Sequence, residues 1–222
     1  LTAQIRPLEK TFLDNYMAKI AFVNPPLSIE DRYGLKTQGG GISPPIGLTH
    51  LAAMTREYGH ETIIIDAAVM NMGYEETARE IIDNGFRYVG FTAVTISIGH
   101  AARLTSVLKN ADNGITVIIG GPHLSAIPFD TMSMFPEFDI GVIGEGDYAI
   151  VEVVHAVEER KPLDRIEGLI VRKNGEIFTT QPRKRIKELD KLPMPAWDLL
   201  PDLAKYYSPH VHTLKRMPGA LL

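Results

Sequence analysis

The sequence predicts an α/β fold with a doubly wound, five-stranded parallel sheet, followed by a small β-hairpin and an extended linker. Three observations lead to this prediction. Short β-branched runs alternate with segments of helical apolar spacing as far as residue 162, and strands joined by helices pair in parallel. The runs are apolar throughout, as a sheet covered on both faces requires. Beyond them, two strand-like runs flank Asn174-Gly175, a dipeptide that favours a tight hairpin turn.

The strands are predicted from runs rich in Val, Ile, Phe and Tyr, the residues that pack well on a pleated surface. Pro25-Pro26 ends the first run, because proline cannot donate a hydrogen bond to a neighbouring strand. The five predicted strands are residues 19–24, 62–66, 88–92, 115–119 and 140–143.

The helices are predicted from apolar residues that recur at helical spacing between these runs. The first covers 46–58 and ends at Gly59, which suits a helix C-cap. A short helix is expected between Ser125 and Met134. Three further helices are marked by Tyr74, Ala78, Ile81 and Ile82, by Ala101, Leu104, Val107 and Leu108, and by Ile150, Val153, Val154 and Val157.

Four segments follow from these patterns. Residues 1–17 form an N-terminal extension, 18–162 a binding domain, 163–185 a β-hairpin appendage, and 186–222 a proline-rich linker toward a further domain.

Composition excludes several classes of protein. The net charge is -4 without a long basic run, so nothing indicates nucleic-acid binding. No apolar stretch approaches the ~18 residues of a membrane span. The chain has no cysteine, which excludes disulfides, zinc–thiolate sites and iron–sulfur ligation within it, and fits a cytoplasmic protein.

The ends of the predicted strands exclude two common ligand sites. A dinucleotide site needs G-x-G-x-x-G after the first strand, where this chain has Asn24-Pro25-Pro26. A receiver domain needs carboxylates for Mg²⁺ at the ends of the first and third strands, which here are Asn24 and Thr92.

Glycines and small hydroxyls at strand ends predict a binding crevice instead. Gly120-Gly121-Pro122-His123 closes the fourth strand and Gly144-Glu145-Gly146-Asp147 the fifth. Glycine lets a large ligand approach the backbone, and ligands of open parallel sheets bind at the carboxyl ends of the strands. The candidate cofactor-binding residues are Asn24, Pro25, Thr92, Thr95, Ser97, Gly120, Gly121, Pro122, His123, Gly144, Glu145 and Gly146.

Several candidates also have a structural explanation, which the sequence leaves open. The glycines suit tight turns, and His123 suits a surface or a helix end. Ser97 suits a helix N-cap, and Glu145 suits the dipole at a helix N-terminus. No residue is assigned a catalytic or metal-ligating role.

The ordered set of motifs resembles the cobalamin-binding domain of B12-dependent radical SAM enzymes, such as the anaerobic magnesium-protoporphyrin IX monomethyl ester cyclases and class B methyltransferases. The resemblance covers about residues 19–200. The matching pieces are Val23-Asn24-Pro25-Pro26, Pro44-Pro45-Ile46-Gly47-Leu48, Val89-Gly90-Phe91-Thr92, Gly120-Gly121-Pro122-His123, Gly144-Glu145-Gly146-Asp147, the Asn174-Gly175 hairpin and Leu192-Pro193-Met194-Pro195-Ala196-Trp197-Asp198.

The resemblance implies a flavodoxin-like sheet of the B12-binding type that binds base-off cobalamin, with the nucleotide tail in a slot beside the third and fourth strands. The chain has no D-x-H-x-x-G motif, whose histidine binds cobalt in other B12 proteins. The resemblance also implies a downstream radical SAM domain that holds a [4Fe–4S] cluster and S-adenosylmethionine. The fragment alone would not be an enzyme, whereas the whole protein would be a cyclase or a methyltransferase.

An alternative from another class is a cofactor-free docking or substrate-recognition module of the same fold. The two hypotheses differ in whether the strand-end loops leave the slot open or fill it with their own side chains. An FMN site is disfavoured, because the loop after the first strand lacks a phosphate cradle.

Overall fold

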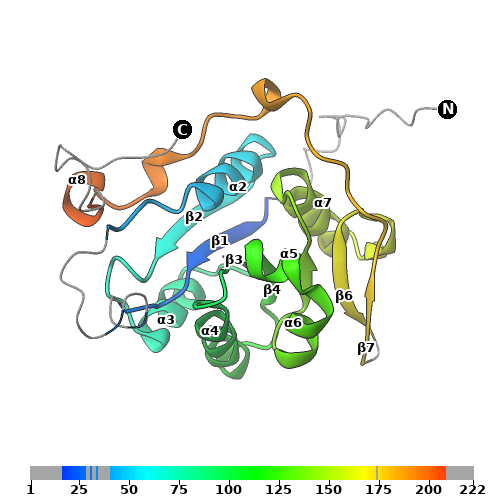
Figure 1. The fold of residues 1–222 in the computed structure, drawn as a ribbon, viewed down its shortest axis with the longest axis horizontal. Coiled ribbons are helices and arrows are strands. Elements are labelled where there is room, and N and C mark those ends of the chain that lie inside the picture. Colours follow the sequence, from blue (N-terminus) through cyan, green and yellow to red (C-terminus); the bar gives the residue numbers. More distant parts are fainter. Residues whose placement is uncertain (1–16, 29–30, 32–33, 35–40, 174, 209–222) are drawn as a thin grey trace.

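The computed structural model describes residues 17–28, 31, 34, 41–173 and 175–208, and they form a seven-stranded mixed sheet with helices on both faces (Figure 1). The strand order is β2-β1-β3-β4-β5-β6-β7. The first five strands in this order are parallel to one another, and β6 and β7 are antiparallel to their neighbours. The strands are β1 (Lys19–Asn24), β2 (Glu61–Asp66), β3 (Tyr88–Thr92), β4 (Thr116–Gly120), β5 (Ile140–Val142), β6 (Leu169–Lys173) and β7 (Glu176–Thr179).

The predicted α/β fold with five parallel strands is confirmed, and the predicted hairpin extends the same sheet. Its first strand, β6, pairs antiparallel with β5, with Gly141 opposite Ile170. A Cβ on Gly141 would lie 2.5 Å from Cγ2 of Ile170, so the close pairing requires a glycine at this position. The hairpin turn includes Asn174, which lies outside the described residues, and Gly175 with φ +83°.

Two layers of helices cover the sheet. One face is covered by α2 (Ile46–Glu57) and α7 (Asp147–Glu158), which contact each other. The other face is covered by α3 (Tyr74–Asp83), α4 (Ile98–Ala111), α5 (Pro122–Ala126) and α6 (Pro128–Met134).

The single short helix predicted near residues 125–134 is two helices, α5 and α6. Proline occupies the first helical position of each, at Pro122 and Pro128, where its missing N–H is no loss. Between them Ile127 adopts an extended φ of -138°. The second proline therefore starts a new helix after a break in the first.

The order β2-β1-β3 places a switch point between β1 and β3. The chain leaves β1 toward α2 on one face and leaves β3 toward α4 on the other, so the two loops diverge. In open α/β sheets, ligands bind in the crevice that such divergence leaves at the carboxyl ends of the strands.

The chain beyond the hairpin crosses back over α2 toward β2 (Figure 1). The backbone N–H of Ala196 donates to the carbonyl of Thr49 at 3.0 Å, and Arg56 forms an ion pair with Asp198 at 2.7 Å. This segment contains the 3₁₀ turns η3 (Leu189–Lys191) and η4 (Trp197–Leu199) and the short helix α8 (Leu203–Tyr206). The predicted linker thus packs on the sheet domain as far as residue 208, and residues 209–222 lie outside the described part.

None of the helices in the described ranges has the length and apolar composition needed to cross a lipid bilayer.

His60 links the opposite edge of the sheet to α7 and gives a pH prediction. The ring is 4% exposed, accepts the N–H of Ala18 through Nδ1, and lies 5.1 Å from the ring of His155. Burial, with His155 nearby, lowers the pKa of His60 to about 4 from the usual 6.5. Between these pH values the unfolded chain binds more protons than the folded chain, so this ring makes acid destabilising.

We expect His60→Asn, whose side-chain oxygen can still accept from Ala18, to reduce the loss of stability in acid. Both proteins should lose unfolding free energy between pH 7 and pH 4, but the loss in the variant should be smaller by about 1–3 kcal/mol. Urea unfolding at several pH values measures the difference. Parallel pH profiles for the two proteins would contradict the prediction.

Candidate functional site

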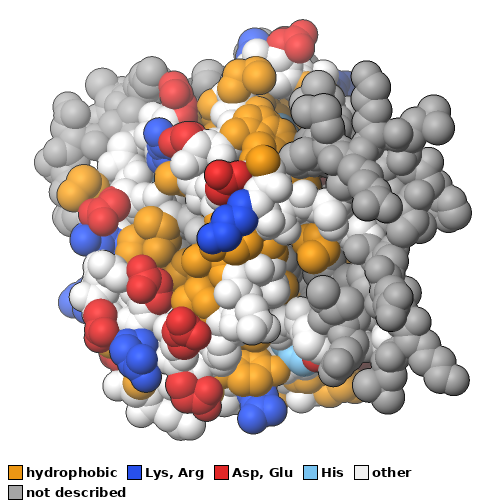
Figure 2. Space-filling model, turned by 90° about the vertical axis from the view of Figure 1, so that its left-hand side faces the viewer, with side chains coloured by type: hydrophobic (Ala, Val, Ile, Leu, Met, Phe, Trp, Pro, Cys, Tyr) orange, Lys and Arg blue, Asp and Glu red, His pale blue; other side chains and the backbone are white. Residues whose placement is uncertain are grey.

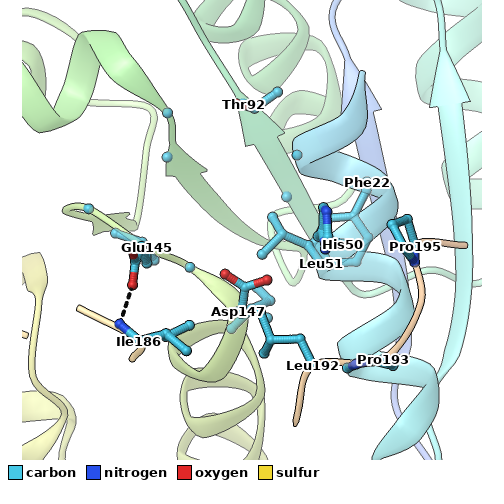
Figure 3. Close-up of a pocket in the computed structure, with 18 of the residues that line it drawn as sticks. Phe22, His50, Leu51, Thr92, Glu145, Asp147, Ile186, Leu192, Pro193 and Pro195 are labelled. Atoms are coloured by element: carbon cyan, nitrogen blue, oxygen red, sulfur yellow. Dashed lines mark hydrogen bonds between the residues drawn. The ribbon is translucent and has the colours of Figure 1, made fainter. Parts of the chain in front are cut away.

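Two cavities open at the carboxyl edge of the parallel strands. The larger, called the slot cavity, has a volume of about 620 Å³, within the range of small-molecule sites. It lies between α2 and α7, above β3, β4 and β5 (Figure 3). Its lining residues are Phe22, Gly47, His50, Leu51, Gly90, Phe91, Thr92, Ile118, Gly120, Gly121, Val142, Gly144, Glu145, Gly146, Asp147, Ile150, Ile186, Leu189, Asp190, Leu192, Pro193, Met194 and Pro195.

Glycines on the sheet face below α2 and α7 create the space for the slot cavity. Gly90 pairs with Phe22 and Ile118, and Gly120 pairs with Thr92 at the strand ends. A Cβ on Gly90 would lie 2.7 Å from the Phe22 ring, so that ring forms the floor. A Cβ on Gly120 would have its nearest neighbour at 3.7 Å, so the missing side chain at Gly120 leaves the cavity open.

A few polar side chains face this apolar space. Asp147 is the first residue of α7, and its carboxylate points into the space between α7 and α2 (Figure 3). Burial raises the pKa of Asp147, and His50 on α2 opposes this shift. Thr92 adds a hydroxyl at the end of β3. Few polar groups in an apolar cavity are typical of a site that orients one specific ligand.

Sequence reasoning missed His50 and Asp147 as site residues. The spacing of Gly47, His50 and Leu51 puts them on one face of α2, which was the pattern available for finding His50.

Besides the sheet below and the helices α2 and α7 at the sides, the slot cavity has a fourth wall. This wall is the segment 186–195, here called the strap. The backbone N–H of Ile186 donates to Oε2 of Glu145 at 2.6 Å (Figure 3). Pro193 and Pro195 continue the wall in extended chain toward α2. Glu145, a candidate for ligand contact, therefore holds the strap.

The smaller cavity, called the switch-point cavity, has a volume of about 320 Å³ at the ends of β1 and β3. Thr92 lines both cavities, so the two are neighbours. Its lining residues are Asn24, Leu27, Ser43, Pro45, Thr92, Ala93, Val94, Ile96 and Ser97. Ser97 stands at the N-cap of α4 without capping it, because its hydroxyl bonds both backbone groups of Val94 at 3.1 and 3.2 Å.

Gly121 is required by the close approach of two loops. Its φ is +97°, and an added Cβ would lie 2.8 Å from the backbone nitrogen of Ala93. The carbonyl of Ala93 in turn accepts the N–H of His123 at 3.2 Å. The tight turn that follows β4 is therefore built against the end of β3.

The candidate residues fall into three groups. The first group lines neither cavity and consists of Pro25, Thr95, Pro122 and His123. In this group, Oγ1 of Thr95 and Nδ1 of His123 form a hydrogen bond of 3.1 Å, Pro25 is buried and Pro122 is exposed. Within the described ranges, no group of three His, Cys, Asp or Glu side chains is placed to hold a metal ion. The slot cavity is lined by Thr92, Gly120, Gly121, Gly144, Glu145 and Gly146, and the switch-point cavity by Asn24, Thr92 and Ser97.

Hydrophobic side chains are also exposed at this edge. Val94 and Ile96 follow β3 and are each nearly half exposed, and Ile127 and Phe129 follow β4. Figure 2 shows the side of the molecule toward which β1 and β2 point, where hydrophobic side chains lie among acidic and basic ones.

A flavodoxin-like strand order with cavities at the carboxyl edge defines an α/β domain that binds a small molecule at its strand ends. Residues 34–154 match the family model of the B12 binding domain, which is more than half of the chain. The chain belongs to the B12-binding domain family.

Two curated relatives match most of this chain. An uncharacterised methyltransferase of Pyrococcus horikoshii is 34% identical over 183 residues, which is 82% of this chain and 39% of that protein. The anaerobic magnesium-protoporphyrin IX monomethyl ester cyclase of a Synechocystis species is 25% identical over 165 residues, 73% of this chain and 33% of that protein. The chain thus spans about a third to two fifths of these relatives.

Solved structures share the fold. The cobalamin-dependent S-adenosylmethionine radical enzyme OxsB, with aqua-cobalamin and S-adenosylmethionine bound, superposes with a TM-score of 0.67 at 14% identity over 82% of this chain and 24% of that one. The radical S-adenosylmethionine methyltransferase TsrM of Kitasatospora setae, with cobalamin and a [4Fe-4S] cluster bound, superposes with a TM-score of 0.61 at 18% identity. The match covers 91% of this chain and 37% of that one.

Glu145→Ala should release the strap, because the N–H of Ile186 loses its acceptor. Amide exchange at Ile186 should quicken by about tenfold, as expected for one lost charge-assisted hydrogen bond. Hydrogen–deuterium exchange of peptides that contain Ile186 measures this. Glu145→Gln, which retains an acceptor oxygen, is the control, and unchanged exchange in the alanine variant would refute the strap contact.

Proposed function

We propose that this chain binds cobalamin, with the nucleotide tail in the slot cavity and the corrin ring over the ends of β1, β3 and β4. The single observation that carries the proposal is the slot cavity of about 620 Å³, which the missing side chain at Gly120 leaves open. The twelve residues selected from the sequence are proposed as its binding set, together with His50 and Asp147.

The chemistry of the slot cavity fits such a tail. Its walls include Leu51, Val142 and Ile150, which suit the faces of an aromatic base. His50, Thr92 and Asp147 offer polar groups for ribose or phosphate. The open slot favours a cofactor over the docking-module alternative, which predicts loops that fill this space.

We propose the base-off form of the cofactor. The loop between β1 and α2 contains no histidine, and none of the described residues that line the switch-point cavity is one. The chain therefore offers no imidazole at this position, and the lower face of cobalt would be open or bound to water. Bound cobalamin would supply methyl transfer or assistance to radical chemistry.

The whole protein is proposed to be a B12-dependent radical SAM enzyme, a methyltransferase or an oxidative cyclase of the magnesium-protoporphyrin IX monomethyl ester type. Curated relatives carry both kinds of name. The chain has no cysteine, so a [4Fe–4S] cluster and its S-adenosylmethionine would belong to another domain, the partner of this one. The proposed division is an extension (1–17), the binding domain (18–162), the hairpin (163–185) and a linker (186–222).

Gly120→Leu tests the site. The backbone of Gly120 is not in the left-handed region, and the first carbon has room, so the variant should fold and place its side chain in the slot cavity. Affinity for hydroxocobalamin, measured by equilibrium dialysis and absorption spectroscopy, should fall at least about tenfold, since the bulk occupies the ligand's volume.

Gly99→Leu on α4 is the matched control, because Gly99 has open space around it and lines neither cavity. Its affinity should equal that of the wild type. Equal binding by Gly120→Leu would place the ligand elsewhere, a base-on spectrum would refute the base-off form, and absence of binding by the wild-type chain would refute the proposal.

A further inference from the structure

Asp66 is a buried carboxylate at the end of β2, with a relative exposure of 1%. It accepts hydrogen bonds from Nδ2 of Asn24 at 2.7 Å and from the hydroxyl of Tyr207 at 2.9 Å. A longer bond of 3.4 Å comes from the N–H of Val69. A carboxyl group buried in this way requires hydrogen-bond partners, so its contacts hold the side chains of Asn24 and Tyr207 in place.

The pairing of the strands puts Asn24 and Asp66 beside each other. They are register partners at the last position of the β1–β2 ladder. The distance between them is therefore set by the sheet and does not depend on the conformation of the loops that follow.

The carboxylate determines which way the Asn24 amide is turned. Nδ2 of Asn24 donates to Oδ1 of Asp66, so the NH₂ group of Asn24 faces Asp66. Asn24 lines the switch-point cavity. The part of the amide that Asp66 does not engage is the carbonyl oxygen, a hydrogen-bond acceptor.

Tyr207 completes the arrangement from a distant part of the chain. It is 3% exposed and follows α8, and the next residue, Ser208, forms two backbone hydrogen bonds with Ile42, at 2.9 and 3.2 Å. Burial and the neighbouring Asp66 carboxylate raise the pKa of Tyr207, so its hydroxyl stays protonated and donates. The donated bond fixes Oδ2 of Asp66 and leaves Oδ1 for Asn24.

We propose that Asp66 and Tyr207 are positioning residues that orient Asn24, so that its carbonyl oxygen accepts a hydrogen bond from the ligand in the switch-point cavity. The inference rests on the proposed cobalamin function. The donor is an N–H or O–H on the lower side of the corrin, from an amide side chain or from water on cobalt. Docking of the segment 203–208 and cofactor binding are then coupled through one carboxylate.

Tyr207→Phe tests the inference in the 222-residue chain. Loss of one positioning hydrogen bond should weaken hydroxocobalamin binding about 3- to 10-fold. Without ligand, the side-chain NH₂ resonances of Asn24 should shift in the NMR spectrum of the variant. Tyr206→Phe is the matched control, because that hydroxyl receives a bond from the exposed Lys205 and lies one residue away.

A double-mutant cycle separates positioning from general stability. If Tyr207 acts through Asn24, Tyr207→Phe should have no further effect on affinity in an Asn24→Ala background. Asp66→Asn is the second variant: its own NH₂ group disfavours the native orientation of Asn24, so affinity should fall at least as far as in Tyr207→Phe.

Each outcome decides the inference. Wild-type affinity in Tyr207→Phe, or an equal loss in the Asn24→Ala background, overturns it and leaves the proposed function standing. No binding by the wild type overturns both. A loss of affinity in Tyr207→Phe that disappears in the Asn24→Ala background supports the inference. A shift of the cobalt absorption band in Tyr207→Phe would then identify water as the donor, and an unchanged band would identify a corrin amide.

Discussion

The reversal of winding between β1 and β3 is the constraint on which the site depends. Because α2 and α4 pack on opposite faces of the sheet, the chain leaves β1 and β3 in opposite directions and the two strand ends diverge. Both cavities occur at this edge, and Thr92, at the end of β3, belongs to both. The glycines enlarge a crevice that the topology has already created.

Closure of the slot cavity comes from outside the parallel sheet. Its floor and two walls are strands and helices, held by two large apolar cores. Its fourth wall is the strap, which is held by the hydrogen bond from Ile186 to Glu145 and by Leu192, whose side chain packs against the core under α2 and α7. The parallel sheet and its helices thus form most of the site, and a segment from after the hairpin forms its outer boundary.

Local patterns in the sequence were sufficient for the parallel strands, for most of the helices and for the edge of the sheet that carries the site. β-Branched runs located the five parallel strands, and the glycines after β4 and β5 led to the slot cavity. What local patterns lack is distance information: Glu145 and Ile186 are 41 residues apart, and Asp66 and Tyr207 are 141 apart. The pairing of β6 with β5, the strap wall and the role of Asp66 depend on such contacts, so they appeared only in the structure.

The position of the strap and of Tyr207 late in the chain has a consequence for biosynthesis. A ribosome synthesises the chain from its N-terminus, so the parallel strands and their helices emerge before residues 186–207. Until then the slot is an open groove, and the amide of Asn24 lacks part of the arrangement that orients it. The proposed cofactor would therefore have access to the slot cavity from this side before residues 186–195 complete its wall.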